Sequence, residues 1–426
     1  MNTLIKNVRF IDPEAGIDEV TDLCVGPDGV KRDENSTDKH SNIIEGTGLW
    51  AIPGLLDLQV HFRQPGFEHK ETIESGSAAA LAGGITAVVV MPNTHPPLDT
   101  PDSVRFEAEE SQRVGGIDIL VAAAATKGLE GKENTDAASL KAAGAVALTD
   151  DGWPVLDDAV MEQSLRDCAA NDLLFMQHAE DTRMSQHAPM TASPTQKKIG
   201  VLGQPSDAEG EMVIRDVALV EKTGARYHVL HCSTERSLNA IREGKKKGLQ
   251  VTCEASPHHL LLSTEDCADA DPNFKMNPPL RSPADRAALV RALADGTVDA
   301  VATDHAPHAA EEKARGFVDA PFGVIGVETA FAALLSFVHD GTISDVRAVE
   351  LMTSSPARVI GLQGQIGTTQ GKAAPAHLCL IDPNHSWTVS LADLKGKSTN
   401  SPFIGHTFKG KVLRTWLRGE ERYCAK

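Results

Sequence analysis

Eight short apolar runs recur along the chain, each followed by a polar or glycine-rich loop and then by a stretch with helical spacing. The runs are GLLDLQVH (54–61), ITAVVVMPN (85–93), DILVAAAAT (118–126), AVALTDD (145–151), LLFMQHAE (173–180), RYHVLHCS (226–233), QVTCEAS (250–256) and VDAVATDH (298–305). Their apolar residues are continuous rather than alternating, which is typical of parallel strands buried on both faces. Helical stretches such as ETIESGSAAALAGG and EGEMVIRDVALVEKTG lie between them. This alternation predicts an α/β fold, a (β/α)8 TIM barrel.

The two ends of the chain have a different pattern. TLIKNVRFID and NIIEGTGLWAIPG near the N-terminus, and AHLCLIDPN and GKVLRTWLRG near the C-terminus, read as short strands separated by Asp, Gly and Pro. We therefore expect residues 1–50 and 356–426 to form one small β-sandwich module beside a barrel over residues 51–355. A doubly wound sheet is the alternative architecture, but no GxGxxG turn follows the first apolar run.

Charge and cysteine content narrow the class of function. The formal net charge of −18 argues against a nucleic-acid or anionic membrane surface, although a single Arg in a cleft can still bind a small anion. No stretch has the ~18 apolar residues that cross a bilayer, and the N-terminus lacks the layout of a secretory signal. Seven scattered cysteines without a CxxC pair fit thiols in a reducing compartment. We expect a cytoplasmic protein acting on a small molecule.

Polar residues gather where the predicted strands end. In a barrel of this kind the chemistry lies at the C-terminal ends of the strands. The residues found there are His61, Asn93, Asp150, Asp151, His178, His231 and Asp304, followed by His308. Imidazole and carboxylate groups without thiolate predict a catalytic Zn²⁺ site, or Mn²⁺ or Co²⁺ in its place. Two ions sharing a carboxylate could activate water and polarise a carbonyl group.

These residues and the motifs around them resemble the class I dihydroorotases of the amidohydrolase superfamily. The resemblance extends from about residue 3 to 420 and is carried by IPGLLDLQVHFRQPG, TDDGWPV, HAED, YHVLHCST, KMNPPLR and ATDHAPH. It implies the zinc-dependent, reversible cyclisation of N-carbamoyl-L-aspartate to (S)-dihydroorotate in pyrimidine synthesis. It also implies a metal-dependent hydrolase barrel, and we expect a homodimer.

The resemblance implies a role for each residue at the strand ends. His61 and Asp304 would bind the first metal, Asp151 would bridge both metals, and His178 and His231 would hold the second. The nucleophile would be water activated by the metal, with Asp304 as general acid and base.

A second set of residues would bind the substrate. The resemblance assigns its carboxylate to Arg63, Asn93 and His308, and its ring to Asn277. Strand periodicity independently places Arg63 on the same face as His61, from which its guanidinium fork suits a carboxylate.

Several nearby polar residues favour other roles. We expect Asp57 to orient a metal ligand and Asp150 to belong to the supporting loop, whereas His228, Cys232, His258 and His259 favour packing; the role of His305 stays open.

Gln59 departs from the family pattern, which has histidine at this position. An amide oxygen binds zinc more weakly than imidazole does, so the second metal site is the more secure and one or two zinc ions per chain are expected. Three hypotheses follow: a working dihydroorotase, a non-catalytic homologue that is a structural partner of aspartate transcarbamoylase, or another cyclic amidohydrolase of the hydantoinase or allantoinase type. The retention of the other site residues favours the first.

Overall fold

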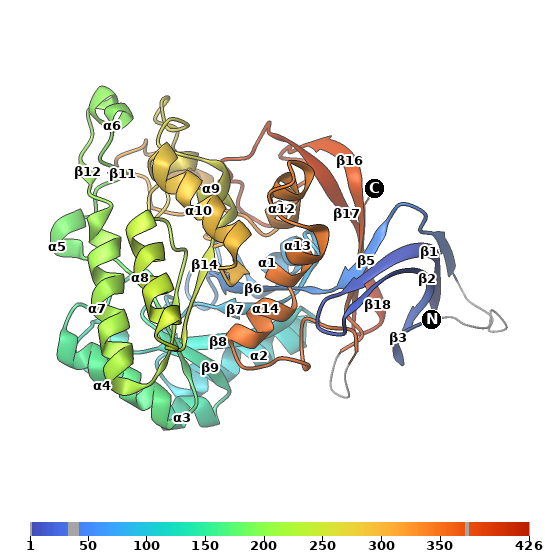
Figure 1. Ribbon diagram of the computed structural model, residues 1–426, viewed down its shortest axis with the longest axis horizontal. Coiled ribbons are helices and arrows are strands. Elements are labelled where there is room, and N and C mark those ends of the chain that lie inside the picture. Colours follow the sequence, from blue (N-terminus) through green and yellow to red (C-terminus); the bar gives the residue numbers. More distant parts are fainter. Residues whose placement is uncertain (1, 33–41, 371–374, 426) are drawn as a thin grey trace.

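The computed structural model describes residues 2–32, 42–370 and 375–425, and within them eight parallel strands form a barrel (Figure 1). The strands are β6 (Leu55–Val60), β7 (Ile85–Val90), β8 (Asp118–Ala124), β9 (Ala145–Thr149), β10 (Leu174–Gln177), β13 (Arg226–Val229), β14 (Val251–Ala255) and β15 (Ala300–Val301). They neighbour one another in chain order. The barrel closes where His61 N donates to His305 O at 2.8 Å, beside a parallel bridge between Val60 and His305. All eight predicted runs contain a barrel strand, so the fold class is confirmed.

Helices surround the strands and bury their outer face (Figure 1). The main helix between each strand and the next, or after the last strand, is, in order, α1 (Ile73–Ala82), α2 (Pro101–Val114), α3 (Ala137–Ala142), α4 (Asp158–Ala170), α7 (Asp207–Thr223), α8 (Glu235–Lys246), α10 (Pro283–Asp295) and α12 (Ala330–His339). In β7, Val88 packs with the helices whereas Val89 packs inside the barrel. Burial on both faces explains why the apolar runs are continuous.

Shorter elements lie in the loops and after the last barrel helix. They are α5 (Thr182–Ser185), β11 (Met190–Thr191), α6 (Pro194–Ile199), β12 (Gly203–Gln204), α9 (Pro257–Leu261), α11 (Ala310–Lys313), α13 (Asp345–Leu351) and α14 (Ser354–Val359). Among the described residues, no helix is both long and apolar enough to cross a membrane.

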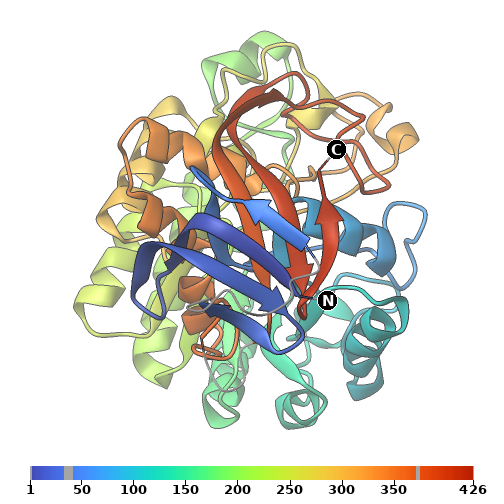
Figure 2. The ribbon, with the colours of Figure 1, turned by 90° about the vertical axis from the view of Figure 1, so that its right-hand side faces the viewer.

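Both ends of the chain contribute to a second sheet, whose N-terminal and C-terminal strands lie side by side (Figure 2). Its strands are β1 (Thr3–Asp12), β2 (Ile17–Gly26), β3 (Gly29–Arg32), β4 (Asn42–Glu45), β5 (Trp50–Pro53), β16 (Leu378–Thr388), β17 (Thr407–Leu417) and β18 (Glu420–Cys424). β5 joins the two ends because it pairs with β1 on one side and β16 on the other. The domain limits at residues 50/51 and 355/356 remain a prediction, and residues 1, 33–41, 371–374 and 426 of those segments lie outside the described residues.

Candidate active site

A cavity of about 340 Å3 lies at the C-terminal ends of the barrel strands. It is lined by all the residues expected to bind metal or substrate apart from Gln59: His61, Arg63, Asn93, Asp151, His178, His231, Asn277, Asp304 and His308. The fold therefore brings together residues that are up to 247 positions apart, counted from His61 to His308. Trp153 and His187 also line the cavity, and sequence reasoning did not single them out.

Two groups of side chains within the described residues have the composition and spacing to hold a metal ion. In the first, His61 Nε2 lies 3.2 Å from both Asp151 Oδ2 and Asp304 Oδ1. In the second, His178 Nδ1 lies 3.0 Å from His231 Nε2 and 3.5 Å from Asp151 Oδ1. Asp151 belongs to both groups, so its carboxylate is placed to bridge two ions.

One oxygen of Asp151 provides a test of whether these residues fit a metal. Asp151 Oδ1 is buried and makes no hydrogen bond within the described part of the chain, although His178 Nδ1 and His231 Nε2 lie 3.5 and 3.6 Å away. Buried polar atoms normally have a partner. A divalent cation among these three groups would satisfy the oxygen, and imidazole with carboxylate is a donor set that zinc favours. The residues therefore fit a metal ion.

The electrostatics of the cavity also favour a cation. Burial alone would lower the pKa of an imidazole. In His61 the hydrogen bonds to Asp151 and Asp304 outweigh burial and raise the pKa to about 9. In His178 the hydrogen bonds to Asp151 and Glu180 likewise outweigh burial and raise the pKa to about 10. The carboxylates thus stabilise positive charge at both rings, and a metal ion bound between these groups would satisfy the same preference.

Three site residues have left-handed backbone, with φ of 65° at Arg63, 32° at His231 and 50° at Asp304. This region costs free energy for any residue with a side chain, and such strain concentrates at functional sites. The surrounding structure must hold these residues in place.

Arg63 reaches the cavity in a different way from the one that strand periodicity suggested. β6 ends at Val60, and its register with β7 shifts between Asp57 and Val60. Alternation along one straight strand therefore does not place Asp57, Gln59, His61 and Arg63 together. Arg63 instead points into the cavity from the loop after β6, in left-handed backbone.

Gln59 is fully buried and does not line the cavity. Neither its Oε1 nor its Nε2 has a hydrogen-bond partner within the described residues. An amide buried in this way loses its bonds to water without replacing them. A buried amide without partners is therefore unusual at position 59, and packing alone does not explain it.

The two candidate metal-binding histidines that directly follow β6 and β10 each have an orienting partner. His61 Nδ1 lies 2.8 Å from Asn93 Oδ1, and His178 Nε2 lies 3.1 Å from Glu180 Oε2. Burial would raise the pKa of Glu180, but the hydrogen bond and charge of His178 lower it to about 2. Glu180 was missed from the sequence, although it stands two residues after His178 in the HAED motif.

The two other aspartates near the strand ends hold backbone in place. Asp57 accepts hydrogen bonds from Thr303 N at 3.0 Å and Thr303 Oγ1 at 2.6 Å, next to Asp304. Asp150 accepts from Thr126 N at 2.9 Å, next to Asp151. These contacts agree with the orienting and loop roles expected for Asp57 and Asp150.

Arg63 and His308 form a cationic, hydrogen-bonding part of the cavity lining. Burial lowers the pKa of Arg63 to about 10, so the guanidinium stays charged at neutral pH. Burial and the charge of Arg63 lower the pKa of His308, so its ring is neutral and Nε2–H donates to Phe322 O at 2.8 Å. Arg63 NH2 lies 3.4 Å from the same nitrogen. Asn277 contacts the metal side of the cavity, where its Nδ2 donates to Glu180 Oε2 at 2.8 Å.

The histidines expected to pack lie outside the cavity lining. His228 is buried 3.1 Å from Glu254 Oε2, and His259 Nε2 donates to Pro278 O at 2.9 Å. His258 is buried beside His259. His305, whose role was open, accepts from Gly326 N through Nδ1.

This barrel with its paired imidazole and carboxylate groups is that of the metal-dependent cyclic amidohydrolases. An L-hydantoinase (dihydropyrimidinase) from Arthrobacter aurescens is similar with a TM-score of 0.86 at 26% identity, covering 98% of this chain and 95% of that chain. A D-hydantoinase from Thermus sp. shares the fold, with a TM-score of 0.80 at 24% identity over 98% of this chain and 94% of that one.

The family follows from the sequence relatives. A profile of the Dihydro-orotase-like family matches residues 48–237. Curated dihydroorotases from Elusimicrobium minutum and Solibacter usitatus are each 40% identical to the chain, over 422 and 421 residues. The alignments cover 99% and 98% of this chain and 97% of each relative. The chain belongs to the dihydroorotase family.

Proposed function

We propose that the chain catalyses the reversible hydrolysis of dihydroorotate to N-carbamoyl-aspartate in pyrimidine synthesis. The observation that carries this proposal is the composition of a single cavity, which is lined both by the cationic Arg63 and by the groups that share Asp151. A cyclic amide with a carboxylate beside it matches both kinds of group. A hydantoinase-type substrate without that carboxylate would leave Arg63 buried and unpaired.

Different residues of the cavity bind the substrate and transfer the proton. Arg63 binds the substrate carboxylate through its guanidinium fork and so orients the ring. Asp304 takes a proton from the attacking water and passes it to the ring nitrogen as the bond between that nitrogen and the carbonyl carbon breaks. A divalent cation bound here supplies Lewis-acid polarisation of the amide carbonyl and of water. In the reverse direction the same groups close the ring.

We further propose zinc as the metal and Asp151, His178 and His231 as its stronger site. This group keeps a full set of zinc-binding side chains. The group of His61, Asp151 and Asp304 lacks the second imidazole of the family pattern because Gln59 occupies that position. One tightly held ion and a second, weakly held ion per chain are expected.

The test is turnover by the purified protein with added Zn²⁺ or Mn²⁺. Ring closure of N-carbamoyl-aspartate is expected at mildly acidic pH, and ring opening of dihydroorotate at alkaline pH. Asp304→Asn should lose activity by roughly 10²- to 10⁴-fold as a general-base variant. No turnover with either metal would overturn the proposal and would favour a non-catalytic partner of aspartate transcarbamoylase. Faster opening of a hydantoin than of dihydroorotate would favour a different cyclic amidohydrolase.

A cytoplasmic location, a homodimer and an association with aspartate transcarbamoylase stay proposals that rest on family membership. Light scattering of the purified chain, with and without the transcarbamoylase, tests the last two: a mass of twice 45.4 kDa supports the homodimer.

A further inference from the structure

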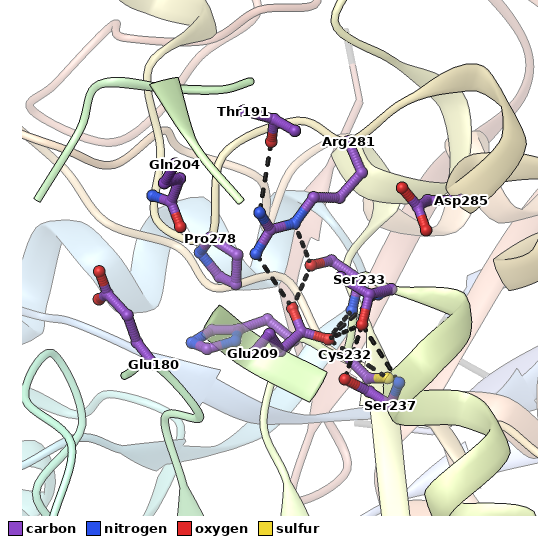
Figure 3. A network of polar contacts seen from close by, with 12 residues as sticks. Glu180, Thr191, Gln204, Glu209, Cys232, Ser233, Ser237, Pro278, Arg281 and Asp285 are labelled. Atoms are coloured by element: carbon purple, nitrogen blue, oxygen red, sulfur yellow. Dashed lines mark hydrogen bonds and ion pairs between the residues drawn. The ribbon is translucent and has the colours of Figure 1, made fainter. Parts of the chain in front are cut away.

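A buried ion pair between Glu209 and Arg281 lies outside the cavity lining (Figure 3). Glu209 is in the first turn of α7, and Arg281 is in the segment that precedes α10. Their exposed fractions are 2% and 4%, and Arg281 NH2 lies 3.3 Å from Glu209 Oε2. Removing two charges from water is costly, and apolar residues often stabilise such positions better. The hydrogen bonds of the pair show which segments of the chain it fixes.

Glu209 holds the loop that follows β13. Its Oε1 accepts from Ser233 N at 3.0 Å, Thr234 N at 3.1 Å and Thr234 Oγ1 at 3.1 Å. Burial would raise the pKa of Glu209, but the charge of Arg281 and the hydrogen bonds from Ser233 lower it. The carboxylate is therefore ionised, and it fixes two successive peptide groups at the start of α8.

Arg281 joins that loop to other segments. Its Nε donates to Ser233 Oγ at 2.9 Å, its NH1 to Thr191 Oγ1 in β11 at 3.3 Å, and its NH2 to Glu209. Figure 3 shows the guanidinium spanning these acceptors. Because the fork is planar and rigid, the three bonds also fix the chain that carries Arg281.

Each held segment carries a residue of the cavity. His231 precedes Ser233 by two positions and has a φ of 32°, which the surrounding structure must maintain. Asn277 precedes Arg281 by four positions. Both side chains meet at His178: its Nδ1 lies 3.0 Å from His231 Nε2, and its Nε2 lies 3.1 Å from Asn277 Nδ2.

We propose that Glu209 and Arg281 are a positioning pair that fixes His231 and Asn277 relative to each other across His178. This inference rests on the proposed function, because it assigns His231 to metal binding and Asn277 to substrate binding. A displacement of either segment would then affect both metal binding and substrate binding. The pair touches neither the metal ligands nor the cavity, so it acts through the two segments.

The test uses three variants of the full chain. Glu209→Gln keeps the acceptor oxygen but removes the charge, and Arg281→Lys keeps the charge but removes the fork. The double variant Glu209→Gln/Arg281→Met leaves no unpaired buried charge and is the variant best placed to fold. The matched control is Glu211→Gln, which breaks an exposed ion pair with Arg236 that joins α7, the helix of Glu209, to α8.

Three measurements are made well below the melting temperature of each variant. We expect zinc to be lost to a chelator at least 10-fold faster in the double variant, and the KM for dihydroorotate to rise at least 5-fold. In the metal-free protein, hydrogen exchange should quicken in both residues 231–235 and 275–281 of Arg281→Lys, although the substitution lies in only one of these segments. Glu211→Gln should match the wild type in all three.

A lower melting temperature with wild-type zinc loss, KM and exchange would overturn the proposal, since that is the result for a purely structural pair. Faster exchange in one segment alone would overturn it as well. Zinc loss and exchange need no turnover. An inactive wild type would therefore count against the proposed function while these two measurements still decide the role of the pair.

Discussion

Asn93 Oδ1 lies 2.8 Å from His61 Nδ1 and fixes which nitrogen of His61 faces the carboxylates. An amide oxygen only accepts hydrogen bonds, so Nδ1 carries a proton and Nε2 is the nitrogen that faces Asp151 and Asp304. In the neutral ring Nε2 then holds the lone pair that a metal ion would take. Asn93 therefore has an orienting role in addition to the contact with substrate expected from the sequence.

Two substitutions of Asn93 should separate these roles. Asn93→Asp keeps the acceptor but places a negative charge in the cavity, so zinc should be retained while the KM for dihydroorotate rises. Asn93→Ala removes the acceptor, and a lost orienting partner typically costs 10- to 100-fold in metal affinity. Zinc titration and steady-state kinetics check both. Equal zinc affinity in the two variants would contradict the orienting role.

Arg63→Ala should raise the KM for dihydroorotate by roughly 10- to 150-fold, which corresponds to the ~1.5–3 kcal/mol of hydrogen bonds to a charged group. Arg63→Lys should recover only part of this, because an ammonium group lacks the planar fork. Arg105→Ala removes an exposed arginine from α2 and is the control. A normal KM in Arg63→Ala would show that the substrate carboxylate binds elsewhere.

Glu180→Gln should weaken zinc binding by roughly 10- to 100-fold, because the carboxylate that accepts from His178 Nε2 is replaced by an amide. The amide can also turn its donor toward His178 and so favour the wrong tautomer. Asp181→Asn, next in sequence and paired on the surface with Arg183, is the control. If zinc affinity were unchanged in Glu180→Gln, Glu180 would not be needed to orient His178 for metal binding.

The barrel could be predicted from the sequence because each strand is buried on both faces, and a strand buried in this way is a continuous run of apolar residues. It predicted His61, Asp151, His178, His231 and Asp304 as a cluster because parallel strands bring their C-terminal ends to one edge. It could not predict how Arg63 reaches the cavity, since the register shift in β6 and the left-handed backbone depend on packing between distant segments.

The contacts that orient the site residues could not be predicted from the sequence either. Glu180 and Glu209 are single carboxylates whose partners lie up to 97 and 72 positions away, in Asn277 and Arg281. Neither has a periodic pattern or a fixed spacing to its partners. Only the folded chain shows that both are buried and ionised next to the segments that carry the site.

Stability should depend on pH through Glu107, which is buried in α2 with Oε2 unpartnered among the described residues. Burial and the neighbouring charge of Glu110 raise its pKa to about 8 from an ordinary value of 4.5. Between these values the folded chain holds a proton that the unfolded chain releases, so this group makes stability fall as pH rises. The slope is at most about 1.4 kcal/mol per pH unit.

Glu107→Gln removes that dependence. Relative to the wild type, its melting temperature should therefore gain more at pH 8 than at pH 5. Glu109→Gln, an exposed change in the same helix, should give a difference that does not vary with pH in this way. If the melting temperatures of wild type and Glu107→Gln differed by the same amount at pH 5 and at pH 8, the result would contradict a buried, protonated carboxyl at position 107.

Gln59 allows the sharpest test of metal stoichiometry, because histidine and leucine at this position predict opposite outcomes. If the amide oxygen is a weak ligand, Gln59→His should tighten the first ion by about 100-fold, or roughly 2.7 kcal/mol, and bring bound zinc toward two per chain. Gln59→Leu should lower bound zinc toward one per chain. Leucine also removes an amide that has no partner among the described residues, so the same variant should melt at a higher temperature.

Zinc per chain after dialysis against metal-free buffer, measured together with kcat, checks these expectations. A rise in both zinc and kcat for Gln59→His identifies the first ion as the limiting one. Unchanged zinc in both variants would show that position 59 does not take part in binding. In that case any zinc held at the first site would be bound by His61, Asp151 and Asp304 alone.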